Sequence, residues 1–262
     1  MTESEFRTIF DTIPEAFDRY RTRYCPELFK NLMGQGGVSP KSRVLELGPG
    51  TGQATEPLLD SGCDYIGIEL GCNFVAVLNK KYGMRSNFHL IHDDFITHDF
   101  GSLKYDLIYS AATIQWIPEE TAFGKTFSLL KPGGMLAMFL TRRDYQTPNP
   151  ALYERIQHVY TQYFKPEIAY SHGSFRYENA LKYGYTDWTR KEFHTVQVYT
   201  ADEYTAFCGT HCDHIVIPEP YRSRFFSGLH EAVMDFGNRI EVYDTHILMT
   251  AKKRLLSQND AV

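Results

Sequence analysis

Cysteine is scarce in this chain of 262 residues, which contains five. They stand at Cys25, Cys63, Cys72, Cys208 and Cys212. An odd number of cysteines in a chain of this size argues against the disulfide framework of a small secreted protein. We therefore expect free thiols and a reduced, cytoplasmic protein.

Long apolar runs and basic runs are absent as well. No stretch reaches the ~18 apolar residues that a membrane-spanning helix needs, and the acidic, polar N-terminal segment lacks the features of a signal peptide. The net charge is −5, and Lys and Arg form no cluster. Neither a membrane nor a nucleic acid is therefore an expected partner, and a small molecule is favoured.

Alternating strand and helix patterns fill residues 40–141. Strands are expected where the chain is almost continuously apolar, at Arg43–Leu47, Asp64–Glu69, Phe88–Ile91, Tyr105–Ser110 and Met135–Thr141. Helices are expected near Gln53–Ser61, Cys72–Tyr82 and Pro118–Leu130, with a turn at residues 131–134. This alternation predicts an α/β fold, in which a parallel sheet is covered on both faces and ligands bind beyond the carboxyl ends of its strands.

The remaining segments are less regular. Helices are expected at residues 14–33, broken near Pro26, and at 150–164, 174–183, 202–208 and 219–236; strands are expected at 192–200 and 241–252. We interpret residues 1–262 as one domain. In it, residues 1–35 form a helical lid, 40–141 the cofactor-binding core, and 142–262 the end of the sheet with helical insertions that cover the pocket.

The stretch RVLELGPGTGQ, residues 43–53, predicts a strand that runs into a glycine-rich loop. Glycines allow a ligand to approach the backbone closely, although they also suit a tight turn without a ligand. The dinucleotide fingerprint G-x-G-x-x-G is not met, because Gln53 stands at the third glycine position and Gly52 comes one residue early. Pro49 also removes an N–H that a diphosphate would use, and Glu46 would place a carboxylate beside the phosphates.

A ligand that carries an ammonium group would instead benefit from Glu46. Its own carboxylate could meet the N–H groups that open the following helix. Glu69 ends the second expected strand, and an acid at that place can accept both ribose hydroxyls. An amino acid joined to a nucleoside satisfies these demands, and S-adenosylmethionine is such a molecule.

Five segments resemble the class I S-adenosylmethionine-dependent methyltransferases, over about residues 14–140. They are VLELGPGTG (44–52), IGIEL (66–70), HLIHDDFI (89–96), YDLIYSAATIQWI (105–117) and LLKPGGMLAMF (129–139). The resemblance implies a Rossmann-like, doubly wound, mostly parallel sheet of seven strands whose last strand is antiparallel. FDRYRTRYCPELF (17–29) resembles a subgroup that acts on small molecules.

The resemblance also implies roles for particular residues. The methionine end of the cofactor would contact Glu46, Gly48, Gly50 and Gly52, and the ribose would contact Glu69 beside Leu70. The residues implied at the adenine are Asp93 through its side chain, Asp94 through its backbone N–H, and Phe95 beside the ring. Those implied at the sulfonium and the substrate entrance are Ser110, Ala111, Gln115 and Trp116. Tyr20 and Arg21 would close over the cofactor, with Arg21 near its carboxylate.

The acceptor and the catalytic residue stay open at this level. Transfer from a sulfonium is an in-line displacement that depends mainly on alignment, so a general base is needed only when the acceptor must lose a proton. Candidate bases are His172, His211 and His214, and aromatic residues available to an acceptor are Tyr145, Tyr170, Phe175, Tyr177, Trp188 and Tyr204. Two alternatives remain: a non-catalytic subunit that binds S-adenosylmethionine, and an NAD(P)-dependent oxidoreductase.

No metal site is expected. The group Cys208, His211, Cys212 and His214 lacks a zinc-finger spacing and favours ordinary helix-end residues. His89, His92 and His98, with the acids around them, straddle the end of a strand, where alternate residues face opposite ways.

Overall fold

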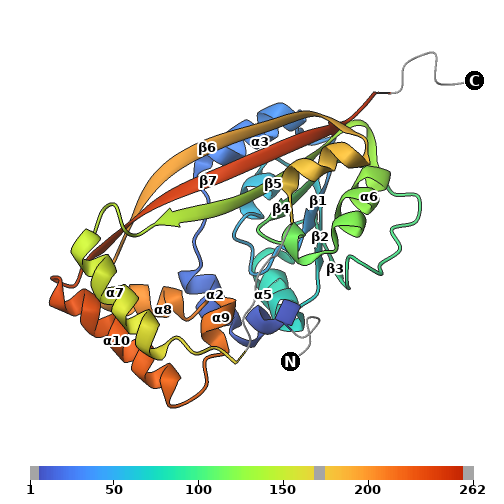
Figure 1. Ribbon diagram of the computed structural model, residues 1–262. Coiled ribbons are helices and arrows are strands. Elements are labelled where there is room, and N and C mark those ends of the chain that lie inside the picture. The colour runs from blue at the N-terminus through green and yellow to red at the C-terminus, as the bar shows by residue number, and fades with distance from the viewer. Residues whose placement is uncertain (1–5, 168–174, 256–262) are drawn as a thin grey trace, which may run out of the picture. The chain divides into compact units, whose positions relative to one another are not determined.

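The computed structural model describes residues 6–167 and 175–255, and within them a seven-stranded sheet with the order β3-β2-β1-β4-β5-β7-β6 (Figure 1). The strands are β1 Arg43–Leu47, β2 Asp64–Glu69, β3 Phe88–His92, β4 Tyr105–Ala111, β5 Leu130–Asp144, β6 Tyr185–Tyr199 and β7 Ile240–Lys253. The five strands from β3 to β5 in this order pair in parallel, and one strand of the sheet runs antiparallel to the rest. The predicted Rossmann-like, mostly parallel fold is confirmed.

Helices connect these strands. The α-helices are α2 Pro14–Tyr20, α3 Pro26–Gly36, α4 Glu56–Asp60, α5 Cys72–Tyr82, α6 Glu119–Leu129, α7 Pro150–Tyr163, α8 Ala201–Cys208, α9 Cys212–Ile215 and α10 Tyr221–Asp235. Three further segments are 3-10 helices: η1 Ile9–Thr12, η2 Ile114–Trp116 and η3 Tyr177–Tyr183. The chain winds from β1 to β3 on one side and from β4 onward on the other, so the switch point of the sheet lies between β1 and β4.

Alternate residues of the central strands enter two separate cores. Val44, Tyr65 and Leu107 pack in a cluster with the buried side chains of α3, α4 and α5. Their neighbours on the same strands, among them Leu45 and Ile108, pack in a second cluster with α6 and η3. Because successive side chains of a strand point to opposite faces, this division means that helices cover both faces of the sheet.

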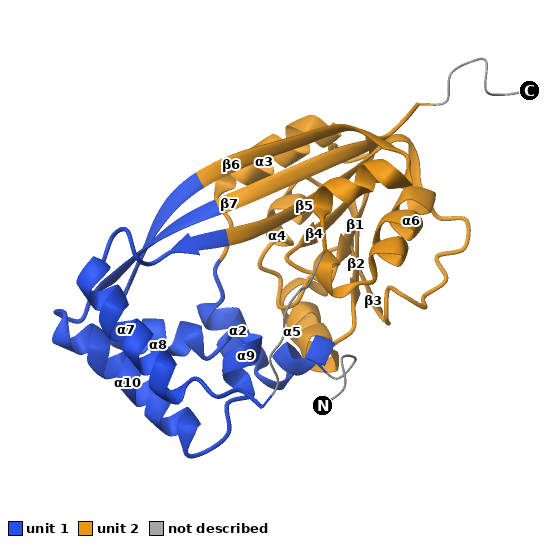
Figure 2. Ribbon diagram, in the orientation of Figure 1, with its two compact units in different colours: residues 1–22, 142–171, 194–245 blue, residues 23–141, 172–193, 246–262 orange. Residues whose placement is uncertain are grey.

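The chain divides into two compact units (Figure 2). Unit 1 comprises residues 1–22, 142–171 and 194–245, and unit 2 comprises residues 23–141, 172–193 and 246–262. Unit 1 has a core of its own, formed by apolar side chains of α7, α8 and α10 such as Phe207 and Phe225. The whole segment predicted as the cofactor-binding core belongs to unit 2.

Three local predictions differ from the structure. The turn expected at residues 131–134 is part of β5. The strand is irregular there: its pairing with β4 shifts register, and Gly133 has a positive φ of 79°. β6 begins at Tyr185, seven residues before the expected strand. The prediction missed this first half because it is polar and belongs to a strand at the edge of the sheet. The helix expected from Gln53 begins at Glu56, since the glycine loop extends further than its pattern indicates.

Candidate cofactor site

The glycine loop follows β1 at the switch point of the sheet. Gly48, Gly50 and Gly52 all have positive φ, at 62°, 61° and 94°. A Cβ on Gly48 would lie 2.4 Å from Cγ2 of Thr113, and one on Gly52 would lie 2.8 Å from the ring of Tyr82. The loop therefore requires glycine at these two positions both for its backbone conformation and for its close packing.

Glu69, at the end of β2, ties this loop to the sheet. Its Oε2 accepts a hydrogen bond from Gly50 N at 2.8 Å, and its Oε1 accepts one from Gly71 N at 2.9 Å. The residue is only 7% exposed. The carboxylate predicted for the ribose, with Leu70 following it, thus lies directly against the loop. The ribose contact itself stays a prediction.

Glu46 lies under the loop in the core on the side of α3, α4 and α5. Its Oε2 accepts hydrogen bonds from Tyr65 Oη at 2.5 Å, Tyr109 Oη at 2.6 Å and Thr55 Oγ1 at 2.7 Å. Its Oε1 is buried and has no hydrogen-bond partner in the described part of the chain. Burial raises the pKa of Glu46 to about 7, and the three hydroxyl donors oppose that rise only in part.

This arrangement bears on what kind of ligand group Glu46 suits. A buried acceptor oxygen without a donor is costly, by about 1–3 kcal/mol. A positively charged donor would satisfy Oε1 and favour the ionised carboxylate, whereas a phosphate would do neither. The residues present therefore fit an ammonium group.

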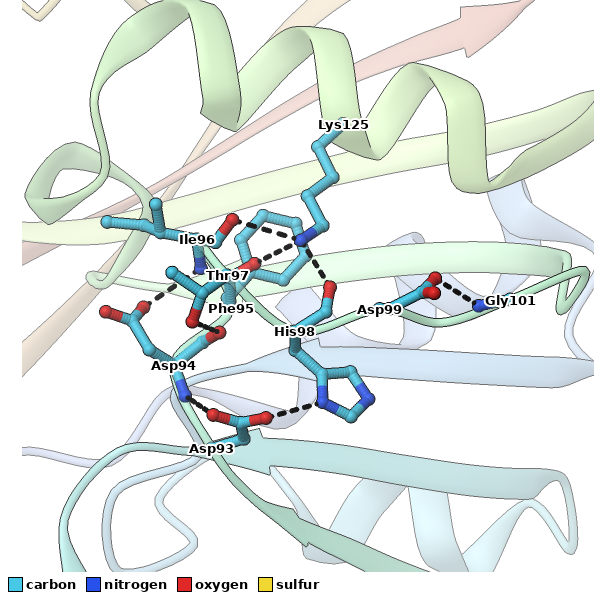
Figure 3. A network of polar contacts seen from close by, with 9 residues as sticks. All are labelled: Asp93, Asp94, Phe95, Ile96, Thr97, His98, Asp99, Gly101 and Lys125. Carbon is cyan, nitrogen blue, oxygen red and sulfur yellow. Dashed lines mark hydrogen bonds and ion pairs between the residues drawn. The ribbon is translucent and has the colours of Figure 1, made fainter.

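The segment Asp93–His98 follows β3 and is held in one conformation by its own polar groups (Figure 3). Asp93 accepts hydrogen bonds from the N–H of Asp94 at 2.8 Å and from His98 Nδ1 at 2.7 Å. Lys125 of α6 donates to the carbonyls of Phe95 at 2.7 Å, Ile96 at 3.2 Å and His98 at 2.6 Å. Lys125 was not among the predicted site residues, because nothing in the sequence near α6 indicates this contact.

Three residues of the Asp93–His98 segment are the predicted adenine contacts, and the structure shows their ionisation, hydrogen bonding and burial. The hydrogen bond from His98, followed by that from Asp94, lowers the pKa of Asp93, so its carboxylate is ionised. The Asp94 N–H, predicted to meet the adenine, donates to Asp93 in this structure. The ring of Phe95 is buried. These adenine contacts stay predictions.

The loop after β4 carries the residues predicted at the sulfonium. Ser110 is buried, and its Oγ accepts a hydrogen bond from Ile114 N at 2.8 Å. Gln115 Nε2 donates to the carbonyl of Ala112 at 3.0 Å, and Ala112 has a φ of 56°. Ala111 and Trp116 are half-buried. This loop reaches the glycine loop, because Thr113 Oγ1 donates to Gly48 O at 3.1 Å.

Four loops of unit 2 therefore leave the same edge of the sheet. They follow β1, β2, β3 and β4, which are parallel neighbours, so their carboxyl ends coincide. The predicted cofactor residues between Glu46 and Trp116 all lie at these strand ends or in these loops. Tyr20 and Arg21 belong to unit 1, where Arg21 donates to Thr210 O at 3.1 Å. Their predicted role at the cofactor stays a prediction.

The other candidates lie in different places. Phe175, Tyr177 and Trp188 belong to unit 2, and Tyr145 and Tyr204 belong to unit 1. Tyr170 and His172 lie outside the described residues. His89 is 3.4 Å from Asp64 and His98 is 2.7 Å from Asp93, so these two histidines contact different carboxylates.

Comparison with known proteins decides between the cofactors. Residues 45–138 match a family model described as a methyltransferase domain. This part of the chain is a class I S-adenosylmethionine-dependent methyltransferase domain. The family's cofactor is S-adenosylmethionine, and the glycine loop, Glu46 and Glu69 all lie in or at the edge of the matched segment.

Several relatives differ in what their names say they methylate. The chain is 40% identical over 99 residues to ribosomal RNA small subunit methyltransferase A of Pseudomonas syringae, which covers 34% of this chain and 37% of that protein. It is 34% identical over 106 residues to malonyl-[acyl-carrier protein] O-methyltransferase 2 of Ilyobacter polytropus, covering 38% of this chain and 40% of that protein. The chain thus spans about two fifths of the length of these relatives.

A solved structure supports the fold over a longer stretch. The chain resembles phosphoethanolamine N-methyltransferase 2 of Haemonchus contortus, in complex with phosphomonomethylethanolamine and S-adenosylhomocysteine, with a TM-score of 0.55 and 16% identity. The match covers 95% of this chain and 60% of that one. In the described residues, no helix is long and apolar enough to cross a membrane.

Lys125→Met should lower the free energy of unfolding by about 2 kcal/mol and weaken S-adenosylmethionine binding, because three carbonyls of the Asp93–His98 segment lose a charged donor. The matched control is Lys104→Met, whose Nζ contacts the single carbonyl of Ser128 at an exposed position. Urea denaturation and ligand titration measure both effects. Equal losses in the two variants would contradict the organising role given to Lys125.

Proposed function

We propose that this methyltransferase transfers the methyl group of S-adenosylmethionine to a small-molecule acceptor by in-line displacement. One observation carries the proposal: the positive-φ glycine loop is flanked by two buried carboxylates, Glu46 and Glu69, and Oε1 of Glu46 has no hydrogen-bond partner among the described residues. Such a cradle suits a nucleoside that carries an ammonium group and disfavours a diphosphate. It therefore supports S-adenosylmethionine over NAD(P).

The protein's own groups would bind and orient rather than react. The bound cofactor supplies an activated methyl group on a sulfonium. The glycine loop and Glu46 would hold its amino acid end, Glu69 its ribose, and the Asp93–His98 segment its adenine. The β4 loop, with Ser110, Ala111, Gln115 and Trp116, would border the reacting centre. Alignment of this kind supplies much of the rate of such a displacement.

The acceptor is proposed to be a small molecule because the net charge of −5 opposes a polyanion. The names of the relatives specify two other acceptors to test, ribosomal RNA and a malonyl group on a carrier protein. A reduced, cytoplasmic setting stays a prediction from the odd number of cysteines.

The test is methyl transfer from radiolabelled S-adenosylmethionine to a panel of acceptors. The panel contains small acids, amines and phenols, a malonyl-carrier protein, and small-subunit ribosomal RNA. Turnover on a small molecule, with S-adenosylhomocysteine as product, is expected. Turnover on RNA or the carrier protein alone would overturn the acceptor class. Tight binding of S-adenosylmethionine without turnover on any acceptor would favour the non-catalytic subunit.

A further inference from the structure

A cluster of metal-ligating residues lies in unit 1, whereas the candidate cofactor loops belong to unit 2. One ligand atom from each of Cys208, His211 and His214 lies within 4.8 Å of the other two. Cys208 is 1% exposed and His214 is 4% exposed. Among residues 6–167 and 175–255, no other group of three or more such side chains comes together in this way. The end of α8 and the start of α9 bring these side chains together, which their sequence spacing does not indicate.

The hydrogen bonds of His214 leave one of its nitrogens as an acceptor. Nδ1 lies 2.8 Å from the carbonyl oxygen of Cys208, and since a carbonyl only accepts, Nδ1 carries the proton. Nε2 is therefore the acceptor nitrogen, and the hydroxyl of Tyr160 donates to it at 3.1 Å, with Oδ1 of Asp213 at 3.8 Å. A metal ion bound at Nε2 would replace the hydrogen bond from Tyr160. A ring N–H bonded to a backbone carbonyl is the usual support of a metal-binding imidazole.

His211 contributes a second imidazole. Its Nδ1 is buried and has no hydrogen-bond partner within the described chain. A neutral imidazole is the form that binds metals. Within the described residues, a bound ion would give this nitrogen a partner.

We propose that Cys208, His211 and His214 bind one zinc ion, with a water molecule as the fourth ligand. Sulfur and imidazole ligands suit zinc, whereas magnesium and calcium prefer oxygen. Zinc–sulfur and zinc–nitrogen bonds of about 2.3 Å and 2.0 Å place one sulfur and two nitrogen ligands roughly 3.3–3.5 Å apart, so the side chains would close by about 1 Å. The Cys208 thiolate would offset part of the charge of the ion. The site would fix the end of α8 to α9.

The experiment uses the full chain, produced with added zinc and purified without a chelator. Near-stoichiometric zinc by elemental analysis is expected. After exchange with cobalt(II), a thiolate-to-cobalt charge-transfer band should appear in the near ultraviolet. Cys208→Ser should abolish that band. The matched control is Cys212→Ser, which removes the neighbouring, half-buried thiol and should keep both the band and the zinc.

Circular dichroism and cooperative thermal unfolding of the whole chain report whether each variant is folded. If Cys208→Ser does not fold, His211→Ala serves as the second variant and should weaken zinc binding at least tenfold while the thiolate band persists. Two results would overturn the proposal. One is wild-type protein that stays free of zinc and shows no cobalt band. The other is a folded Cys208→Ser variant with the zinc content and band of the wild type.

Discussion

Gly48→Ala is expected to lower the free energy of unfolding by about 3 kcal/mol and to weaken S-adenosylmethionine binding at least tenfold. A left-handed backbone costs an alanine about 1–2 kcal/mol. The new Cβ would also lie 2.4 Å from Cγ2 and 2.9 Å from Oγ1 of Thr113, and overpacking of this kind costs about 1–3 kcal/mol more. Chemical denaturation and isothermal titration measure the two effects.

Gly37 provides the matched control. It has a φ of 60°, close to the 62° of Gly48, but a Cβ there would meet nothing within 4 Å. Gly37→Ala should therefore cost only the backbone strain, about 1 kcal/mol, and leave ligand binding unchanged. Adding Thr113→Ser to Gly48→Ala removes the nearer clashing atom and should restore part of the stability. Equal costs at Gly37 and Gly48, or no gain from Thr113→Ser, would mean that Thr113 does not limit this position.

Glu46 should make the stability of the protein depend on pH. Its pKa rises from 4.5 to about 7 on folding, so between these values the folded state binds more protons than the unfolded state. The contribution of Glu46 to the free energy of unfolding should therefore be fully present below pH 4.5 and be lost as the pH rises to about 7. A shift of this size corresponds to a loss of about 3 kcal/mol.

Glu46→Gln isolates this effect, because other titrating groups cancel in the difference between the two proteins. The stability of the wild type relative to Glu46→Gln should fall by about 3 kcal/mol between pH 4.5 and pH 7 and then stay level. If Glu46 meets the ammonium group, affinity for S-adenosylmethionine should rise with pH over the same range in the wild type only. A stability difference between the two proteins that does not change with pH would contradict the raised pKa of Glu46. Affinity profiles that change with pH in the same way in both proteins would contradict the ammonium contact.

The sequence predicted the centre of the fold well, for a physical reason. β1 and β2 have the bounds expected from their apolar runs, Arg43–Leu47 and Asp64–Glu69, because both faces of these strands are buried. Glycines and turn residues mark the ends of such apolar runs, so the bounds of these strands could be predicted. β6 is an edge strand whose first half is mostly exposed, so its pattern of apolar residues is weak and its start was predicted wrongly.

The site was predictable only in part. Glu69 was identified because it ends β2, and Glu46 because a carboxylate beside the glycine loop suits an ammonium group and not a diphosphate. The groups that hold them and their loops were not, since Tyr65, Tyr109, Thr113 and Lys125 contact the site from distant parts of the chain. The proximity of Cys208 and His214 likewise depends on the short helix α9, and a helix of four residues is too short to be predicted from its sequence.

The most direct test of the central claim is thermal unfolding of the whole chain with S-adenosylmethionine, S-adenosylhomocysteine, NAD and NADP in separate samples. A ligand at 100 times its dissociation constant stabilises the folded state by about 2.7 kcal/mol, which is readily measured. The account predicts that the two adenosyl ligands raise the melting temperature and that the two dinucleotides leave it unchanged. A shift with NAD or NADP alone would contradict it and would show that Glu46 does not exclude a diphosphate from the glycine loop.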